Sequence, residues 1–349
     1  MLAMKRLLCI VLLLCVALVQ AGPIKISSLH PILSDMAREI GGDKVSVHDL
    51  FPANASLHDF QPTANELSLA LGSKLLLALG KGVEPYLPSL RQNISAKTRF
   101  VELGASIPDV KVPGTDSIDP HWWNSPANMK RASRTLLEEL VAIDPTNEAY
   151  YTKRQKAYAE EMDSLLLMGR ILLGKLKPEQ RVLVTEHAAM CHFCEAFRLT
   201  PMSIQGVAAE SQGDPATLAR LMAELRRLKV RCLFTEYNGS PRNMQVIASQ
   251  LGAATLSLVM DGIAPDMPTY KQQMTYNIGA VAAGLGDSKK KAASAPKDEN
   301  IGELLMELQK KAEVQARREL EQERKAAAGL QAGRPANAPA GRRVSPPRF

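Results

Sequence analysis

The sequence has few aromatic residues, few cysteines and no long apolar run beyond its first 21 residues. Of its 349 residues, 5% are Phe, Trp or Tyr, and five are Cys. The low cysteine count excludes a disulfide-dense small protein, and no later segment has the run of about 20 apolar residues that a membrane-spanning helix needs. The chain also lacks a P-loop, a G-x-S-x-G turn and an H-E-x-x-H motif. It therefore carries no local signature of a nucleotide-binding, serine-hydrolase or zinc-peptidase site.

The first 21 residues have the three parts of a secretory signal. A short basic start precedes an apolar run from Leu7 to Val19, and the segment closes on Ala21 before Gly22. Small residues at these last positions are typical of a signal-peptide cleavage site. A lipoprotein anchor at Cys15 is the alternative, although the small residue that usually precedes a lipidated cysteine is missing. The pattern predicts an exported protein that is soluble once the leader is cleaved.

Two stretches of the mature chain alternate short β-rich runs with helical patterns. The length of 349 residues allows about two domains, and this alternation predicts mainly parallel sheets covered by helices, in two similar α/β lobes. The expected strands are 25–29, 46–51, 74–79 and 98–103 in the first lobe, and 181–186, 202–207, 230–236 and 255–260 in the second. The expected helices are 31–40, 64–71, 215–229, 241–251 and 270–285.

A single long helix is expected between the two lobes. From Pro145 onward, apolar residues recur at helical spacing for about 30 residues, which gives a rod of about 45 Å. Asp144 is a suitable N-cap, and proline is favoured in the first turn. A break near Gly169 is the alternative. The predicted organisation is thus a lobe at 22–143, a linker helix at 144–177, a second lobe at 178–286 and a tail at 287–349.

The positive charge is concentrated at the two ends of the chain. Residues 288–349 contain 14 basic and 8 acidic residues, whereas residues 22–287 contain 27 basic and 28 acidic ones. The formal charge of +7 is therefore a property of the leader and the tail, and the core gives no reason to expect a nucleic-acid partner. The tail has a charged helical pattern at 300–328 and a Pro-, Gly- and Arg-rich end that predicts disorder. It either contacts an anionic membrane surface or is a solvated appendage.

Four side chains able to bind a metal follow strand or turn signals. They are His58, His121, His187 and Asp261, separated by 63, 66 and 74 residues. No local motif connects residues so far apart, so the spacing alone leaves open a shared site or four unrelated loop residues. In parallel sheets, however, ligands bind beyond the carboxyl ends of strands.

Several segments resemble signature segments of one protein family. They are LHDFQPT at 57–63, GKGVEPYL at 80–87, DPHWW at 119–123, TEH at 185–187, and VMDG at 259–262 followed by Tyr270 and MTYN at 274–277. In this order they are similar to the zinc/manganese solute-binding proteins, the metal-binding receptors of bacterial ABC importers. The resemblance runs from about residue 25 to residue 285.

The resemblance implies a fold, a ligand set and a role. The fold is two α/β lobes joined by a long helix, with the metal in the cleft between them. The ligands would be His58 and His121 from the first lobe, and His187 and Asp261 from the second. Three imidazoles and one carboxylate suit tetrahedral Zn²⁺ as the transported substrate. Mn²⁺ or Fe²⁺ is the alternative, because related manganese receptors carry Glu in place of the third His and Glu186 stands beside it.

The implied protein is a periplasmic, monomeric receptor that delivers its metal to the membrane permease of an ABC importer, and it is not an enzyme. A secreted zinc hydrolase is the rival interpretation. Catalytic zinc usually keeps three protein ligands and one position for water, and a fourth protein ligand would occupy that position.

The chain departs from the family pattern after the third histidine. The segment Cys191-His192-Phe193-Cys194 stands where relatives more usually have Asp and Tyr, and the 111–118 loop has no histidine. We expect either a disulfide between two of Cys191, Cys194 and Cys232, or an accessory metal site that includes His192; redox activity is a third reading. His30 and His48 are expected to be surface or strand-end residues. Because His30 ends the first strand, a place in the cleft behind the ligands is the alternative for it. Trp122 and Trp123 are expected to pack the cleft wall.

Overall fold

The computed structural model describes residues 22–51, 60, 62–63, 66, 68, 70, 72–94, 96–204, 215–237, 242–286 and 314. The expected leader with Cys15, nearly all of the tail, and His58 lie outside these described residues, as does most of the helix expected at 64–71. Among the residues that are described, no helix combines the length and apolar character needed to cross a bilayer.

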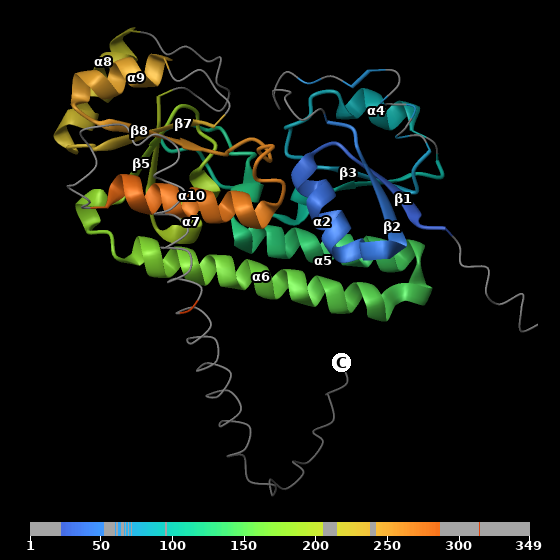
Figure 1. The fold of residues 1–349 in the computed structure, drawn as a ribbon. Coiled ribbons are helices and arrows are strands. Elements are labelled where there is room, and N and C mark those ends of the chain that lie inside the picture. The colour runs from blue at the N-terminus through green and yellow to red at the C-terminus, as the bar shows by residue number, and fades with distance from the viewer. Residues whose placement is uncertain are drawn as a thin grey trace, which may run out of the picture.

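Two four-stranded parallel sheets form the two lobes, as predicted (Figure 1). The first contains β1 (Ile24–Ser28), β2 (Val45–Asp49), β3 (Leu75–Ala78) and β4 (Arg99–Glu102), in the order β2-β1-β3-β4. The second contains β5 (Val182–Thr185), β6 (Thr200–Ser203), β7 (Cys232–Glu236) and β8 (Ala254–Leu258), in the equivalent order β6-β5-β7-β8. In each sheet the strand order reverses beside the first strand, which is where ligands bind in such sheets.

The helices within the lobes mostly begin and end close to the predicted residues. They are α2 (Pro31–Gly41), α4 (Leu87–Asn93), α7 (Cys191–Phe197), α8 (Pro215–Arg227), α9 (Arg242–Leu251) and α10 (Tyr270–Leu285). The boundary of α10 is fixed by a capping box, in which Thr269 and Gln272 bond to each other's backbone N–H. The short α4 was not predicted, because its seven residues offer less than two full helical periods.

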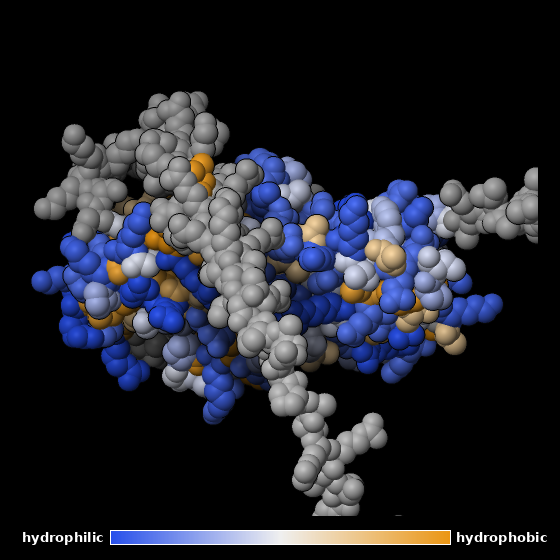
Figure 2. Space-filling model, turned by 90° about the horizontal axis from the view of Figure 1, so that it is seen from below, coloured by the Kyte–Doolittle hydropathy of each residue, from blue (hydrophilic) through white to orange (hydrophobic). Residues whose placement is uncertain are grey.

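The linker helix is longer than any other described helix and is unbroken. α6 (Glu148–Gly174) runs beneath both lobes in Figure 1 and packs against α2 of the first lobe and α10 of the second, whereas α5 (Pro126–Ile143) lies beneath the first lobe and packs along α6. α6 has 27 residues, about 40 Å. The predicted start at 145 was three residues early, because residues 145–147 form a separate 3-10 turn. From below, the face that α6 occupies is largely hydrophilic (Figure 2).

Gly169 allows close packing of α6 rather than breaking it. A Cβ at this position would lie 2.2 Å from the ring carbon Cε1 of Phe197 in α7, so only glycine permits this approach. The aromatic ring of the second lobe thus fits directly against the helix backbone.

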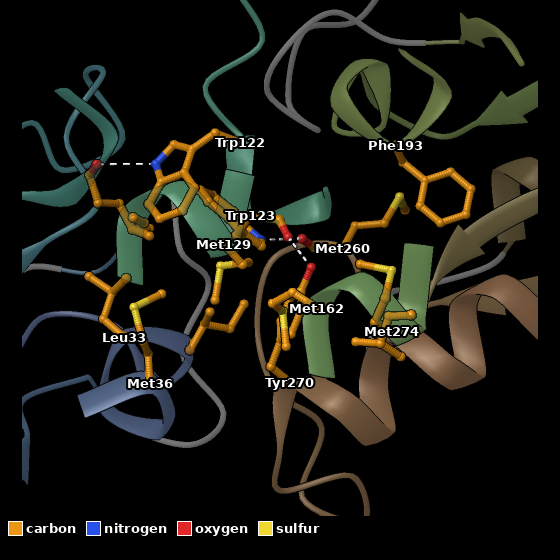
Figure 3. Packing of buried hydrophobic residues seen from close by; sticks show 14 of the residues in the cluster. Leu33, Met36, Trp122, Trp123, Met129, Met162, Phe193, Met260, Tyr270 and Met274 are labelled. Atoms are coloured by element: carbon orange, nitrogen blue, oxygen red, sulfur yellow. Dashed lines mark hydrogen bonds between the residues drawn. The ribbon is translucent and has the colours of Figure 1, made fainter. Parts of the chain in front are cut away.

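A shared hydrophobic core joins the two lobes (Figure 3). Trp123 donates its indole N–H to the carbonyl of Met260 at 2.8 Å, and the Tyr270 hydroxyl donates to the carbonyl of Trp123, also at 2.8 Å. Trp122 donates to the carbonyl of Leu79 at 3.2 Å. Both tryptophans and Tyr270 are fully buried. Because their polar N–H and O–H groups are satisfied, these large rings fill the junction without an unpaired donor.

Candidate metal site

Three of the four predicted ligands converge where the lobes meet. His121 lies in the loop between β4 and α5, His187 two residues after β5, and Asp261 three residues after β8. Asp261 Oδ1 is 3.4 Å from His121 Nε2 and 3.2 Å from His187 Nε2. One ligand atom from each residue lies within 4.8 Å of the others, close enough for a single metal ion to bind all three. The structure therefore gathers His121, His187 and Asp261, whereas His58 is outside its described part.

His121 is held in position by Asp119. One oxygen of this carboxylate, Oδ1, accepts from the His121 backbone N–H at 2.9 Å and faces the ring Nδ1 at 2.7 Å. Burial alone would raise the pKa of Asp119, but these bonds outweigh it and hold the pKa below its ordinary value. The ionised carboxylate can only accept, so Nδ1 carries the proton and Nε2 presents its lone pair to the site.

Asp119 also reaches across to the second lobe. Its second oxygen accepts from the Cys191 backbone N–H at 2.8 Å, and its carbonyl lies 3.0 Å from His192 Nε2. The other ring nitrogen of His192 contacts Asn128 at 3.1 Å. Both nitrogens of His192 are therefore engaged away from the metal ligands. The role of Asp119 was not predicted from the sequence. Its position two residues before His121 was the signal that could have indicated this role.

The cysteines do not form the predicted disulfide in this structure. Cys191, Cys194 and Cys232 are free, buried thiols. Cys191 packs in a small cluster with Val112 and Ala188, whereas Cys194 and Cys232 belong to the main core, so their side chains serve different packing environments. Among the described residues, the only group of three or more suitable ligands is the one at the lobe junction. No accessory metal site forms around His192 in that part of the chain.

The second-lobe ligands His187 and Asp261 form a pair of opposite charges. Burial alone would lower the pKa of His187, but the charge of the Asp261 carboxylate and its hydrogen bond raise the pKa to about 9. Asp261 is the more accessible partner, since its side chain is 21% exposed against 2% for His187. At neutral pH the His187 imidazole is therefore protonated and paired with Asp261, and a metal must displace this proton.

Glu236 is a buried carboxyl beside the site that sequence reasoning did not identify. It ends β7, and its Oε1 accepts from the Met260 backbone N–H at 3.2 Å. Burial and the charge of Asp261 raise its pKa to about 8, and Oε2 has no hydrogen-bond partner in the described structure. Its position at the carboxyl end of a parallel strand was the available signal.

His30 connects the first lobe to the backbone of a second-lobe ligand. Its Nδ1 accepts from the Ile32 N–H at the start of α2, so Nε2 is the donor to the carbonyl of Asp261 at 3.0 Å. Burial lowers the pKa of His30 to about 4, which keeps the ring neutral in this bridging role. Asn124 adds a second link, donating to the carbonyls of Ala189 at 2.9 Å and Met260 at 3.0 Å. The loop carrying Asp261 is thus bonded to the first lobe at several points.

The donor set fits a divalent transition-metal ion. Two imidazole nitrogens and one carboxylate oxygen are ligands that suit zinc, iron and related metals. Buried orienting groups lie behind His121 and beside Asp261, as is typical of metal sites. The partial exposure of Asp261 offers an approach from solvent.

Comparisons with known proteins agree with this geometry. The family model described as "Zinc-uptake complex component A periplasmic" matches residues 28–284. The chain is 24% identical over 276 residues to the manganese ABC transporter substrate-binding lipoprotein PsaA of Streptococcus pneumoniae, covering 75% of this chain and 89% of that protein. It is 25% identical over 272 residues to the iron-binding protein YfeA of Yersinia pestis, covering 76% and 88%.

Solved structures show the same fold. The periplasmic zinc-binding protein TroA from Treponema pallidum superposes with a TM-score of 0.69 at 21% identity, covering 76% of this chain and 100% of that one. A zinc-bound deletion mutant of ZnuA superposes with the same TM-score of 0.69 at 24% identity, with the same coverage.

Proposed function

The chain belongs to the family of periplasmic zinc-uptake components, and from this premise we propose that it captures Zn²⁺ between its lobes and delivers it to the permease of an ABC importer. The similar proteins are named as a manganese ABC transporter substrate-binding lipoprotein and an iron-binding protein, and none of these names describes an enzyme. A divalent metal is therefore the transported substrate, and we choose zinc, the metal named in the family description and for two similar structures, over manganese and iron.

The observation that carries the proposal is the convergence of two imidazoles and one carboxylate across the lobe junction. His121 comes from the first lobe, and His187 and Asp261 come from the second. A bound ion would therefore bridge the lobes. We propose His58 as the fourth ligand, completing a tetrahedral set that suits Zn²⁺.

Zinc is favoured over manganese by the identity of the third ligand. The converging group contains His187 and not its neighbour Glu186, whose carboxyl faces the backbone N–H of Glu236 instead. An imidazole in place of a carboxylate favours zinc, since manganese prefers oxygen ligands. The general affinity order of divalent metals also places zinc above manganese and iron.

The residues around the site support capture with little lobe movement. Asp119 orients His121, and His30, Trp123 and Asn124 bond the Asp261 loop to the first lobe. A metal ion that enters the site would displace the proton of His187. The ion would then lie between the imidazoles and the Asp261 carboxylate and bind all three. The surface of the closed, metal-bound cleft would then be what the permease recognises.

Metal competition tests the proposal. Mature protein is loaded in an equimolar mixture of Zn²⁺, Mn²⁺ and Fe²⁺ under anaerobic conditions, and the bound metal is measured by elemental analysis. We expect the protein to bind one equivalent of zinc and the Asp261→Ala variant to lose it. Asp266→Ala is the matched control, because Asp266 lies in the same loop but accepts a hydrogen bond from Tyr237. This variant should retain the zinc. Manganese outcompeting zinc would overturn the metal assignment. Zinc retention by Asp261→Ala, with loss of a hydrolytic activity, would favour the rival zinc hydrolase.

Three further parts of this proposal lie outside the described residues or concern assembly. We infer that the leader directs export with cleavage before Gly22, that the mature protein acts as a monomer, and that the tail remains solvated or contacts anionic lipid. Mass spectrometry of the secreted protein tests the cleavage site, and sedimentation analysis tests the monomer.

A further inference from the structure

A cavity far larger than a metal ion lies beneath the second lobe. Its volume is about 710 Å³, and it is bounded by α5, α6, α7 and the residue before β5. None of the three converging ligands lines it. This volume falls within the range of about 300–1,000 Å³ that is usual for small-molecule sites.

Arginines dominate the charged lining of this cavity. Arg131 comes from α5, Arg170 from α6, Arg198 from the end of α7 and Arg181 from the start of the second lobe, whereas Glu195 is the one acidic residue among the described lining residues. Cations gathered around a concave surface raise the local concentration of anions. The lining is therefore electrostatically suited to a negatively charged ligand.

Arg181 is already occupied by the fold. Its guanidinium donates to the carbonyls of Leu173 and Gly174 at the end of α6, and to those of Phe197 and Arg198 at the end of α7. It thus caps the carboxyl ends of two helices, where cations are stabilising. We assign it a structural role at the cavity wall.

The other three arginines have no such partners. Within the described structure, the guanidinium groups of Arg131, Arg170 and Arg198 form no hydrogen bond or ion pair. Several other guanidinium groups of the same structure pair with carboxylates, as in Arg38–Asp49, Arg91–Glu102 and Arg99–Glu139. These three residues are solvent-exposed and line one cavity without carboxylate partners. Their charges are screened by solvent, and their guanidinium groups are available to pair with an anion that enters the cavity.

Arg198 occupies a backbone conformation that arginine rarely adopts. It ends α7 with φ 57° and ψ 44°, the left-handed region where glycine is the usual residue. A glycine here would relieve the backbone but remove a guanidinium from the cavity. The arginine therefore provides the cavity with a charge at a position where the fold alone favours glycine.

The remaining lining indicates the kind of anion. Leu166, Ala196 and Phe197 provide an apolar wall, and Ser125 and Asn128 provide polar groups. Guanidinium groups bind phosphate oxygens in bidentate geometry, and the cavity exceeds the size of inorganic phosphate. We propose that this cavity binds an organic anion that carries a phosphate group, with Arg131, Arg170 and Arg198 as the phosphate ligands and the apolar wall contacting the organic part.

Direct binding measurements test the proposal on the mature protein. Glycerol 3-phosphate and pyrophosphate are titrated by calorimetry as soluble probes, and phosphatidylglycerol vesicles in a phosphatidylcholine background are tested by co-sedimentation. The variants are Arg131→Gln combined with Arg170→Gln, and separately Arg198→Gly. Arg134→Gln is the matched control, since Arg134 lies on α5 outside the cavity lining. Circular dichroism melting checks that each variant folds, and Arg198→Gly is compatible with the local backbone.

We expect the double variant to weaken binding by about tenfold or more, because it removes charged hydrogen bonds to the ligand. The control should bind within about twofold of the unaltered protein. Binding of glycerol 3-phosphate that is lost in the variants supports a free organic phosphate, whereas binding of pyrophosphate without glycerol 3-phosphate contradicts an organic ligand. Vesicle binding alone, lost in the same variants, supports the same site with a lipid headgroup as its source. Absence of both, or equal weakening in Arg134→Gln, overturns the proposal. Zinc binding by the same variants is measured in parallel. The presence or absence of anion binding can therefore be distinguished from the success or failure of the proposed metal-binding function.

Discussion

The two lobes share one strand order but present their metal ligands in different ways. In the first lobe, His121 is fully buried and its orientation is fixed by two bonds to Asp119. In the second, His187 and Asp261 lie two and three residues after their strands and contact each other. The first lobe therefore offers a ligand ready to bind, and the second offers a charge pair that must exchange a proton for the metal. We call His121 with Asp119 the preset half of the site, and His187 with Asp261 the titrating half.

The largest predicted effect comes from removing the carboxylate of the titrating half. Asp261→Asn keeps the shape of the side chain but loses the charge that both compensates the metal and raises the pKa of His187. We expect zinc affinity to fall by more than about 100-fold, since even orienting groups behind a metal ligand contribute about 10- to 100-fold. Competition against a chromophoric chelator measures the change. A fall smaller than that of Asp119→Asn would contradict the division between the two halves.

Weakening the preset half should have the next largest effect. Asp119→Asn replaces an acceptor-only carboxylate by an amide, so it loosens the orientation of His121 and its contact with Cys191. We expect zinc affinity to fall by about 10- to 100-fold, with altered Co²⁺ absorption bands. Asp116→Asn, a fully exposed change in the same loop, is the control. Equal behaviour of the two variants would show that Asp119 does not position the ligand.

Lowering the pH should weaken binding through the titrating half. His187, with a pKa of about 9, binds its proton at pH 7, and zinc must displace it. Zinc affinity should therefore fall by about tenfold per pH unit between pH 8 and pH 7, a range that lies above the ordinary imidazole pKa of about 6.5. Calorimetry in buffers of different ionisation enthalpy counts the released proton. In Asp261→Asn the slope should flatten; an unchanged slope would assign the proton to another group.

The link between the halves should have a smaller effect. His30→Asn retains a good N-cap for α2 but loses the bond to the Asp261 carbonyl. One such bond contributes about 1 kcal/mol, so we expect about a fivefold loss of zinc affinity with nearly the same melting temperature. His48→Asn, on an exposed histidine of β2, serves as the control. Unchanged zinc affinity in His30→Asn would show that the hydrogen bond between His30 and the Asp261 carbonyl does not contribute to metal binding.

The smallest expected effect is on overall shape. Because Trp123, Asn124 and His30 already bond the lobes together, zinc should change the radius of gyration by less than about 1 Å. Small-angle scattering of metal-free and zinc-loaded protein measures this. A change of several Å would show that the lobes open as rigid bodies and that these bonds break on metal release.

The sequence predicted the sheets and most helices because their signals are local. Short β-rich runs located the strands, and the helix predicted at 270–285 coincides with α10. α5 was missed even though Met129, Ala132, Leu136 and Leu140 recur at helical spacing. The early start of α6 arose because Asp144 and Pro145 resemble a helix start but instead open a 3-10 turn.

The site was predictable only where a motif preceded it. His121, with its partner Asp119, and His187 and Asp261 stand in recognisable segments. His30 and Glu236 reach the site only through contacts between residues distant in sequence. Glu236 lies 25 residues before Asp261 in the sequence, and no local pattern indicates that burial places them together. The cysteines show the same limit: Cys191 and Cys194 have the spacing of a disulfide or metal motif, yet they pack into different clusters.

The contact between Gly169 and Phe197 lets α6 set the distance between the two lobes. Arg154, on the same helix, donates to the Glu39 carbonyl in the first lobe, 15 residues before the glycine that fits the second lobe. These anchors are about 22 Å apart along one rigid rod. Inserting or deleting one residue between them would shift one lobe by about 1.5 Å and turn it by about 100° relative to the other. The distances between the metal ligands of the two lobes therefore depend on the number of residues between Arg154 and Gly169. Insertions or deletions in this span should be far less tolerated than point substitutions on its exposed face.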